Sequence, residues 1–304
     1  MAIKNVFVGV IARSFGGTTV TGRHSYQFEF SEQEMLPLAK VVDYLAAAPG
    51  NAILVDITSS QDVADQYPNF LSSGVNIITP NKKAFAGSYK LWQDVFSAAS
   101  SSGAKIYHES SVCAGLPILS TLKELVDTGD IIERIDGSAV VKKAMDLGYT
   151  EPDPRDDLNG LDVARKLTVL ARLSGLPVQS HTLFPVQSLI PKELESCTSG
   201  EEFMQKLHEY DSRMEEIKSE AEKEGKAVRH VGSIDIQSKQ VRVGLEKFDK
   251  SDPIAALRGN DNAISFHTRR YGASPLIIQG AGAGGDLTAM GITGDLIKIL
   301  ERSS

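Results

Sequence analysis

The strongest constraint on the fold is a repeated pattern in the first third of the chain, where short apolar runs alternate with segments of helix length. Asn5–Ile11, Ile53–Ile57 and Val75–Thr79 have the length and composition of buried strands. Strands that alternate with helices predict a parallel sheet of the Rossmann-like type. Ligands bind such sheets at the carboxyl ends of the strands, where this chain has the polar runs Asp56–Ser60 and Pro80–Lys83.

The last quarter of the chain has the pattern of strands joined by short turns. Val228–Ile236 and Val241–Lys247 predict a β-hairpin, and Ala263–Thr268 and Leu276–Gln279 extend it to an antiparallel sheet. Glu201–Lys223, before the hairpin, predicts a highly charged helix with a solvated face. The predicted fold class is therefore α/β, a Rossmann-like domain with an α+β region.

Composition excludes several classes of function. The 304 residues are 41% hydrophobic and 23% charged, which is ordinary for a globular protein of two or three domains. A net charge of −7 without a basic tract argues against nucleic-acid binding, and no apolar run reaches the ~20 residues of a membrane span. Cys113 and Cys197 are too few for a disulfide framework or a zinc site. With no signal-peptide pattern after Met1, we expect a cytoplasmic protein.

The stretch Leu147–Lys166 combines a stiff acidic loop with the start of a helix. Pro152 and Pro154 keep the first half extended, and five carboxylates and three cations fall between positions 151 and 166. Asn159 suits the N-cap of a helix that ends near Gly175. The stretch therefore predicts a rigid, charged entry to a helix.

On that helix Asp162 and Lys166 are four residues apart, so their side chains share a face and can form an ion pair. From the pattern alone, a capped surface helix after a polar loop explains the charges equally well. The residues themselves are more specific. They match, almost position by position, the signature Gly-Tyr-x-Glu-Pro-Asp-Pro-x-x-Asp-Leu-x-Gly-x-Asp-x-x-Arg-Lys of homoserine dehydrogenases, which the chain resembles from Asn51 onward apart from a gap near Ala139.

The resemblance implies the NAD(P)-dependent interconversion of L-homoserine and L-aspartate 4-semialdehyde, an oxidoreductase reaction of threonine and methionine biosynthesis. The expected catalytic residues are Lys166, which gives and takes the proton, and Lys82, which positions substrate and cofactor. The substrate-binding residues expected are Glu151, Asp162, Lys82, Gly148, Tyr149 and Asp157. The cofactor-binding residues expected are Thr58, Ser59, Lys82, Gly284 and Arg13. Because neighbouring carboxylates favour the ammonium form, Lys166 should be protonated near neutral pH, and homoserine oxidation should favour alkaline pH.

Two of these residues have simpler interpretations. Lys82 could be an exposed loop lysine, and Arg13 could be a loop arginine. If Arg13 follows the second strand of a nucleotide fold, it would meet a 2′-phosphate, and NADP(H) would be accepted at least as well as NAD(H).

The small-residue turn from Glu109 to Pro117 is a candidate cation site, because backbone carbonyls in such turns can coordinate a hard monovalent ion. In the resembled family the matching turn binds sodium, through groups that fall here on Glu109, Val112, Ala114 and Leu116. Cys113 replaces a residue that is usually glycine there, so a positive φ at this position would be strained. A purely structural turn is the alternative.

The resemblance also implies a domain plan and a homodimer. Residues 1–106 and 285–304 would form the nucleotide-binding domain, 107–118 and 231–284 the dimerisation region, and 119–230 the catalytic domain. The literal Gly-x-Gly-x-x-Gly match at Gly280, Gly282 and Gly285 is interpreted as a close-packing turn that returns the last helix to the nucleotide-binding domain.

Two stretches that family members have are missing here. No glycine-rich turn, helix and second strand follow Ile11, and a Ser-Gly-Thr-containing segment is missing near Ala139. We expect the chain to be interrupted at Ile11/Ala12 and at Ala139/Val140. A continuous chain would instead favour a non-catalytic amino-acid-binding dimer, and another NAD(P)-dependent amino-acid dehydrogenase is a further alternative.

Overall fold

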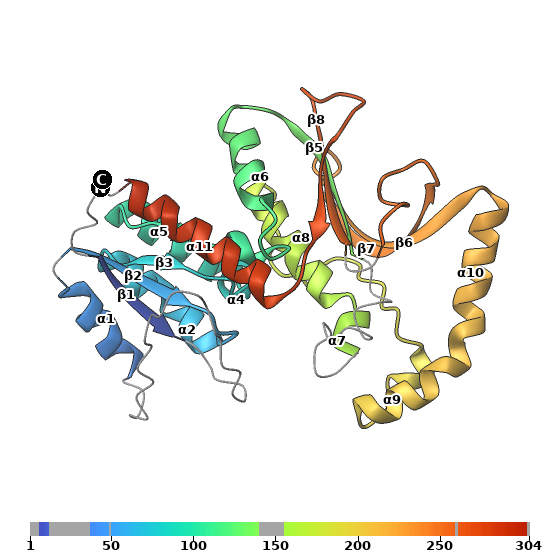
Figure 1. The fold of residues 1–304 in the computed structure, drawn as a ribbon, viewed down its shortest axis with the longest axis horizontal. Coiled ribbons are helices and arrows are strands. Elements are labelled where there is room, and N and C mark those ends of the chain that lie inside the picture. Colours follow the sequence, from blue (N-terminus) through green and yellow to red (C-terminus); the bar gives the residue numbers. More distant parts are fainter. Residues whose placement is uncertain (1–5, 12–36, 49, 140–154, 259–260, 303–304) are drawn as a thin grey trace.

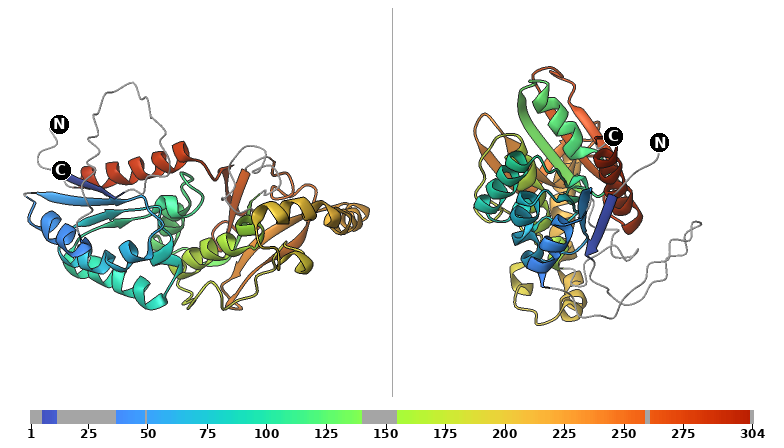
Figure 2. Two further views of the ribbon diagram at one scale, coloured as in Figure 1. Left: turned by 90° about the horizontal axis from the view of Figure 1, so that it is seen from below. Right: turned by 90° about the vertical axis from the view of Figure 1, so that its left-hand side faces the viewer.

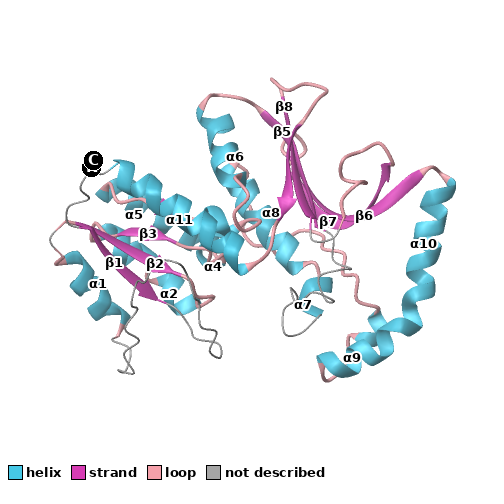
Figure 3. Cartoon of the chain, in the orientation of Figure 1, coloured by secondary structure: helices cyan, strands magenta, loops and turns pink. Residues whose placement is uncertain are grey.

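The computed structural model describes residues 6–11, 37–48, 50–139, 155–258 and 261–302. These residues form two sheets with a row of helices between and around them (Figure 1). The helices and strands alternate along the first part of the chain, and strands dominate the last part (Figure 3). The predicted fold class, a Rossmann-like domain with an α+β region, is confirmed.

The first sheet is parallel, with strand order β1-β2-β3-β4. Its strands are β1 (Val6–Ile11), β2 (Asn51–Asp56), β3 (Asn76–Ile78) and β4 (Ile106–Tyr107). The helices that connect them are α1 (Leu38–Ala46), α2 (Gln61–Asp65), α3 (Tyr67–Ser72), α4 (Lys83–Ala86) and α5 (Tyr89–Ser102).

Alternate side chains of the first sheet belong to two separate cores, because successive residues of a strand point to opposite faces. Leu54 and Ile77 pack with the helices of the connections, whereas Ile53 and Ile78 pack against Ile299 of α11 (Gly285–Arg302). The last helix thus returns to the first sheet and covers the face opposite α1 and α5 (Figure 2). The prediction that the last helix returns to the first part of the chain is therefore confirmed.

The second sheet is antiparallel, with strand order β7-β6-β5-β8-β9. Its strands are β5 (Ile132–Ala139), β6 (Lys226–Asp235), β7 (Gln240–Asp249), β8 (Asp261–Thr268) and β9 (Leu276–Ala281). The predicted hairpin is present as β6 and β7, and both later strands are found where the sequence placed them. The remaining helices are α6 (Ile118–Asp127), α7 (Arg155–Leu158), α8 (Leu161–Leu173), α9 (Gly200–Leu207) and α10 (Asp211–Lys223), none of which can span a membrane within the described residues.

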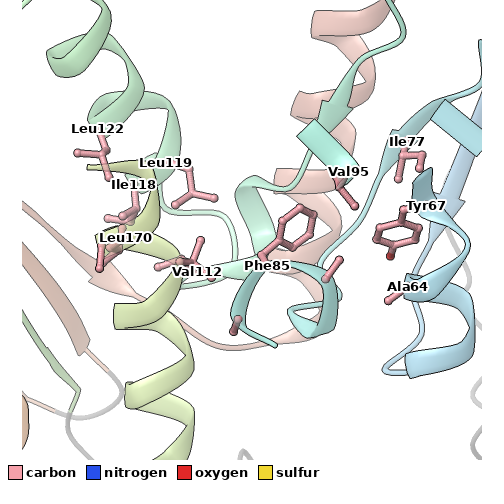
Figure 4. Packing of buried hydrophobic residues seen from close by; sticks show 14 of the residues in the cluster. Ala64, Tyr67, Ile77, Phe85, Val95, Val112, Ile118, Leu119, Leu122 and Leu170 are labelled. Atoms are coloured by element: carbon pink, nitrogen blue, oxygen red, sulfur yellow. The ribbon is translucent and has the colours of Figure 1, made fainter. Parts of the chain in front are cut away.

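One continuous core joins the two sheets. Phe85 of α4 is fully buried beside the first sheet, while Leu170 of α8 lies beside Ile118 and Leu122 of α6 under the second (Figure 4). Where α8 packs on the second sheet, Gly232 of β6 has no room for a side chain, because a Cβ there would lie 2.6 Å from Leu167 of α8. Because the core is shared, the position of α8 relative to α4 is fixed by packing.

The two expected gaps in the sequence follow β1 of the first sheet and β5 of the second sheet. Within the described residues β1 pairs with β2 alone, so it is an edge strand. Ala12 and Val140 lie outside the described residues, so the expected interruptions at Ile11/Ala12 and Ala139/Val140 stay a prediction. The proposed domain boundaries also stay a prediction.

The docking of α11 on the first sheet can be tested with two isoleucines of that helix. Ile299 is 2% exposed and Ile297 is 49% exposed. We expect Ile299→Ala to lower the free energy of unfolding by about 2–5 kcal/mol, because a buried isoleucine is truncated. Ile297→Ala should change it by no more than about 0.5 kcal/mol. Equal effects of the two substitutions in urea unfolding would contradict this packing.

Candidate active site

The helix α8 brings Asp162 and Lys166 together as its sequence spacing requires. Lys166 Nζ lies 2.8 Å from Asp162 Oδ2, a salt bridge between successive turns. The N-cap is Gly160 with φ +76°, so the prediction of Asn159 at that position was wrong by one residue. Asn159 still contributes to the helix start, because its Oδ1 accepts a 2.8 Å hydrogen bond from the Leu161 N–H. The predicted end of the helix is confirmed, with Gly175 at φ +87° after the C-cap Ser174.

Lys82 reaches the same carboxylate from the other half of the molecule. It stands between β3 and α4, at the N-cap of α4, and its Nζ lies 3.4 Å from Asp162 Oδ1. The side chains of Lys82, Asp162 and Lys166 are 31%, 41% and 17% exposed, so the cluster is open to a small ligand. Lys82 is therefore no isolated loop lysine.

The two ammonium groups determine the charge state of Asp162. Desolvation acts to raise its pKa, but the charges of Lys166 and Lys82 outweigh it and hold the pKa of Asp162 well below its usual range. Asp162 is therefore a carboxylate at neutral pH, flanked by a lysine from each half. The arrangement can hold one ammonium group in place and present it to a polar substrate.

A buried polar cluster fixes the loops that follow β2 and β3. The fully buried carboxylate of Asp56 accepts hydrogen bonds from the Tyr67 hydroxyl, from Asn81 Nδ2 at 3.2 Å and from the Thr58 N–H at 2.8 Å. Asn81 Nδ2 also donates to Ser60 O at 3.0 Å, and the Asn81 N–H donates to Thr79 Oγ1 at 2.9 Å. Burial and the nearby carboxylate raise the pKa of the Tyr67 phenol, which keeps it a donor.

This polar cluster positions several of the predicted cofactor-binding residues. Thr58 and Ser59 lie in the loop between β2 and α2, with Ser59 exposed, and Lys82 directly follows Asn81. Gly284, with φ +127°, lies at the start of α11. All four residues therefore lie outside the secondary-structure elements, in loops or at helix starts, where a ligand can reach them.

The candidate cation turn is strained, as the sequence suggested. Cys113 and Ala114 have φ values of +57° and +51°, in the left-handed region that costs a residue with a Cβ about 1–2 kcal/mol. The carboxylate of Glu109 accepts hydrogen bonds from the N–H groups of Leu119 (2.7 Å) and Ser120 (3.0 Å) and so caps α6. The four predicted ligands Glu109, Val112, Ala114 and Leu116 belong to this one turn.

The remaining predicted site residues fall mainly outside the described part of the chain. Arg13, Gly148, Tyr149 and Glu151 lie outside the described residues, and only the backbone of Asp157 is described, within α7.

Comparisons with known proteins agree with this geometry. The family model for homoserine dehydrogenase matches residues 130–297, and the model for the NAD-binding domain of homoserine dehydrogenase matches residues 20–109. The chain is 56% identical to a homoserine dehydrogenase from Paracoccidioides brasiliensis, over 86% of this chain and 78% of that protein. The chain belongs to the homoserine dehydrogenase family. It is also 46% identical to the homoserine dehydrogenase of Saccharomyces cerevisiae, over 96% of this chain and 88% of the relative.

Solved structures show the same fold. A crystal structure of a protein of unknown function from Candida auris superimposes with a TM-score of 0.84 at 46% identity, over 89% of this chain and 82% of that one. A crystal structure from Archaeoglobus fulgidus, of a protein assigned as a homoserine dehydrogenase, superimposes on this chain with a TM-score of 0.65 at 21% identity and shows the same fold.

Sequence reasoning missed Asp56, Tyr67 and Asn81 as a unit. Asp56 and Asn81 stand in the two polar runs at the strand ends, so the pattern pointed to their location. Tyr67 begins a helix and carries no such signal, and its contact with Asp56 depends on the folded packing of α3 against β2 and β3.

The hydrogen bond from Tyr67 to Asp56 in this polar cluster can be tested by removing the Tyr67 hydroxyl. We expect Tyr67→Phe to lower the free energy of unfolding by about 1–3 kcal/mol, because the buried carboxyl group of Asp56 loses a hydrogen bond. We also expect a higher KM for the cofactor, since the loops at 58–60 and 80–83 lose a common support. The control Tyr44→Phe removes a hydroxyl from a side chain that is 71% exposed and should be neutral. Unfolding and kinetics of Tyr67→Phe equal to those of Tyr44→Phe would refute the role of the cluster.

Proposed function

We propose that this NAD(P)-dependent oxidoreductase of the homoserine dehydrogenase family uses Lys166 as the proton donor and acceptor at the oxygen of L-aspartate 4-semialdehyde and L-homoserine. The observation that supports this most is the Lys82–Asp162–Lys166 cluster, which joins the two halves of the molecule beside the carboxyl ends of β2 and β3. The reaction is a step of amino-acid biosynthesis.

The polar groups at the strand ends fit a dinucleotide. Thr58, Ser59 and Lys82 follow the carboxyl ends of β2 and β3, where parallel sheets bind such ligands. Gly284 precedes α11, which packs on the same sheet. A hyperthermophilic archaeal homoserine dehydrogenase of similar fold, at 24% identity and a TM-score of 0.60, has been solved in complex with NADPH. The bound cofactor would supply a hydride to the aldehyde carbon. That Arg13 lets NADP(H) be accepted at least as well as NAD(H) remains a prediction, because Arg13 lies outside the described residues.

The proposed proton transfer follows from the ion pair on α8. Asp162 favours the ammonium form of Lys166 and orients it, so that a proton is available to the aldehyde oxygen during reduction. Both carboxylate oxygens of Asp162 lie near lysines, so we assign to Asp162 the orientation of Lys166. We assign the binding of the substrate ammonium group to Glu151. Lys82 positions substrate and cofactor from the opposite side. Oxidation needs the neutral amine, so its rate should rise as the pH is raised, whereas reduction should not gain.

The alternative of a non-catalytic amino-acid-binding dimer makes a different prediction in one assay. Oxidation of NAD(P)H in the presence of L-aspartate 4-semialdehyde should be catalysed by this protein, and a binding protein would show none. Faster turnover of a different amino-acid substrate would instead indicate another NAD(P)-dependent amino-acid dehydrogenase.

The proton-donor role is tested by Lys166→Ala. We expect turnover to fall by roughly 10²–10⁴-fold with the fold and cofactor binding retained, since a general acid and base is lost. The control is Lys123→Ala, which removes a lysine that also pairs with an aspartate one helical turn away, at an exposed site on α6. Activity close to that of the control would overturn the assignment.

A monovalent cation, sodium in our proposal, binds the strained turn that contains Glu109, Val112, Ala114 and Leu116. Strain of this kind concentrates at functional sites, and here two successive residues of the turn, Cys113 and Ala114, have a positive φ. We expect activity or thermal stability to be higher in sodium than in choline chloride at equal ionic strength. Equal activity and equal thermal stability in the two salts would exclude a functional sodium site in this turn.

We also infer a homodimer that forms through the strand-rich region 228–279. The last strand of the second sheet, β9, pairs only with β8 among the described residues, and unpaired edges favour association. Sedimentation at micromolar concentration should give the mass of two chains, and a monomer would exclude the proposal. A cytoplasmic location is inferred from the two free cysteines, and cell fractionation would test it.

A further inference from the structure

Arg172 is a buried arginine on the helix that also carries Asp162 and Lys166. It is 3% exposed, and its guanidinium donates to four backbone carbonyls: Phe85 O at 2.6 Å, Gly87 O at 2.7 Å, Val178 O at 2.9 Å and Gln179 O at 3.1 Å. The same guanidinium lies 5.3 Å from the centre of the Tyr89 ring. A buried charge requires such compensation, which fixes the geometry of every group involved.

Two of the four acceptors belong to the end of α4, the short helix that starts after Lys82. Phe85 is within α4, and Gly87 is its C-cap. Carbonyls at a helix C-terminus have no partner inside the helix and attract a cation. Burial lowers the pKa of Arg172 to about 10, so it is still a cation at neutral pH. His181 Nδ1 lies 3.2 Å from Ala86 O, so the loop after α8 also contacts α4.

The helices α4 and α8 are therefore joined at two points. At one end Lys82 meets Asp162 over 3.4 Å, and at the other Arg172 binds the carbonyls of α4 (Figure 1 shows the two helices side by side). The first joint is partly exposed and lies in the proposed site, so a charged substrate will compete for it. The second joint is buried and uses backbone acceptors, so a substrate leaves it unchanged.

We propose that Arg172 is a positioning residue, which holds α4 against α8 so that Lys82 stays in register with Asp162 and Lys166 during turnover. The inference rests on the proposed function, because it assigns Lys82 a part in the reaction. A misplacement of about 1 Å in such a site can cost 10²-fold in rate. A residue that only stabilised the fold would affect unfolding and leave the contribution of Lys82 intact.

The test is a double-mutant cycle between Arg172→Lys and Lys82→Ala. Arg172→Lys keeps the charge but loses the planar fork that serves several carbonyls. We expect it to lower kcat/KM for L-aspartate 4-semialdehyde by roughly 10–100-fold in the wild-type background. In the Lys82→Ala background the same substitution should lower kcat/KM by no more than about twofold, because the side chain that it positions is already gone. Circular dichroism and urea unfolding establish which variants are folded, and Arg172→Gln replaces Arg172→Lys if the latter is not.

Two matched controls accompany the cycle. Arg229 donates to the carbonyls of Ile254 and Ala255, in the loop between β7 and β8, so Arg229→Lys should affect unfolding and leave kcat/KM unchanged. Lys83→Ala removes the exposed neighbour of Lys82 and should have little effect. Equal losses from Arg172→Lys in both backgrounds, or no loss in either, would overturn the role of Arg172 alone. Wild-type activity of Lys82→Ala would overturn the part of Lys82 in the proposed function, and the inference with it.

Discussion

The geometry of the proposed site depends on one carboxylate, that of Asp162, which two lysines from different halves share. Lys166 belongs to its own helix, but Lys82 comes from the loop after β3 of the first sheet. Two positive charges so close together repel, and the shared carboxylate makes the pair stable. The site therefore exists only when α4 and α8 are held at one distance, and the continuous core and Arg172 both serve that requirement.

The two sheets contribute different properties to the site. The parallel sheet is covered by helices on both faces, so the carboxyl ends of its strands are rigid and only the loops after them are exposed. Asp56, Tyr67 and Asn81 make these loops a single hydrogen-bonded unit. The antiparallel sheet packs against α8 through close contacts such as that of Gly232 on β6 with Leu167. Rigid supports on both sides explain how partly exposed lysines can keep a fixed geometry.

Much of this was predictable from the sequence, for reasons of periodicity. The helical repeat places Asp162 beside Lys166 in any helix that includes both, and the strand pattern places Lys82 after a strand of a parallel sheet. Periodicity does not encode contacts across the halves, and it was the family resemblance that put Lys82 in one site with Asp162 and Lys166. Arginine on a helix is usually exposed, so nothing in the sequence marks Arg172 as buried among carbonyls. The N-cap was misassigned because Gly160 adopts a positive φ and Asn159 supports the helix from one residue earlier.

The most direct test of the account is a measurement of the Asp162 carboxyl group itself. In a protein with ¹³C-labelled aspartate, the carboxyl signal of Asp162 can be assigned by its loss in Asp162→Asn and followed as the pH is lowered from 7 to 3. This signal should not titrate in that range in the wild-type protein, and the pKa of Asp162 should rise in both Lys82→Ala and Lys166→Ala. Titration near the ordinary aspartate pKa of about 3.9 in the wild-type protein, or no response to the loss of Lys82, would contradict the shared carboxylate.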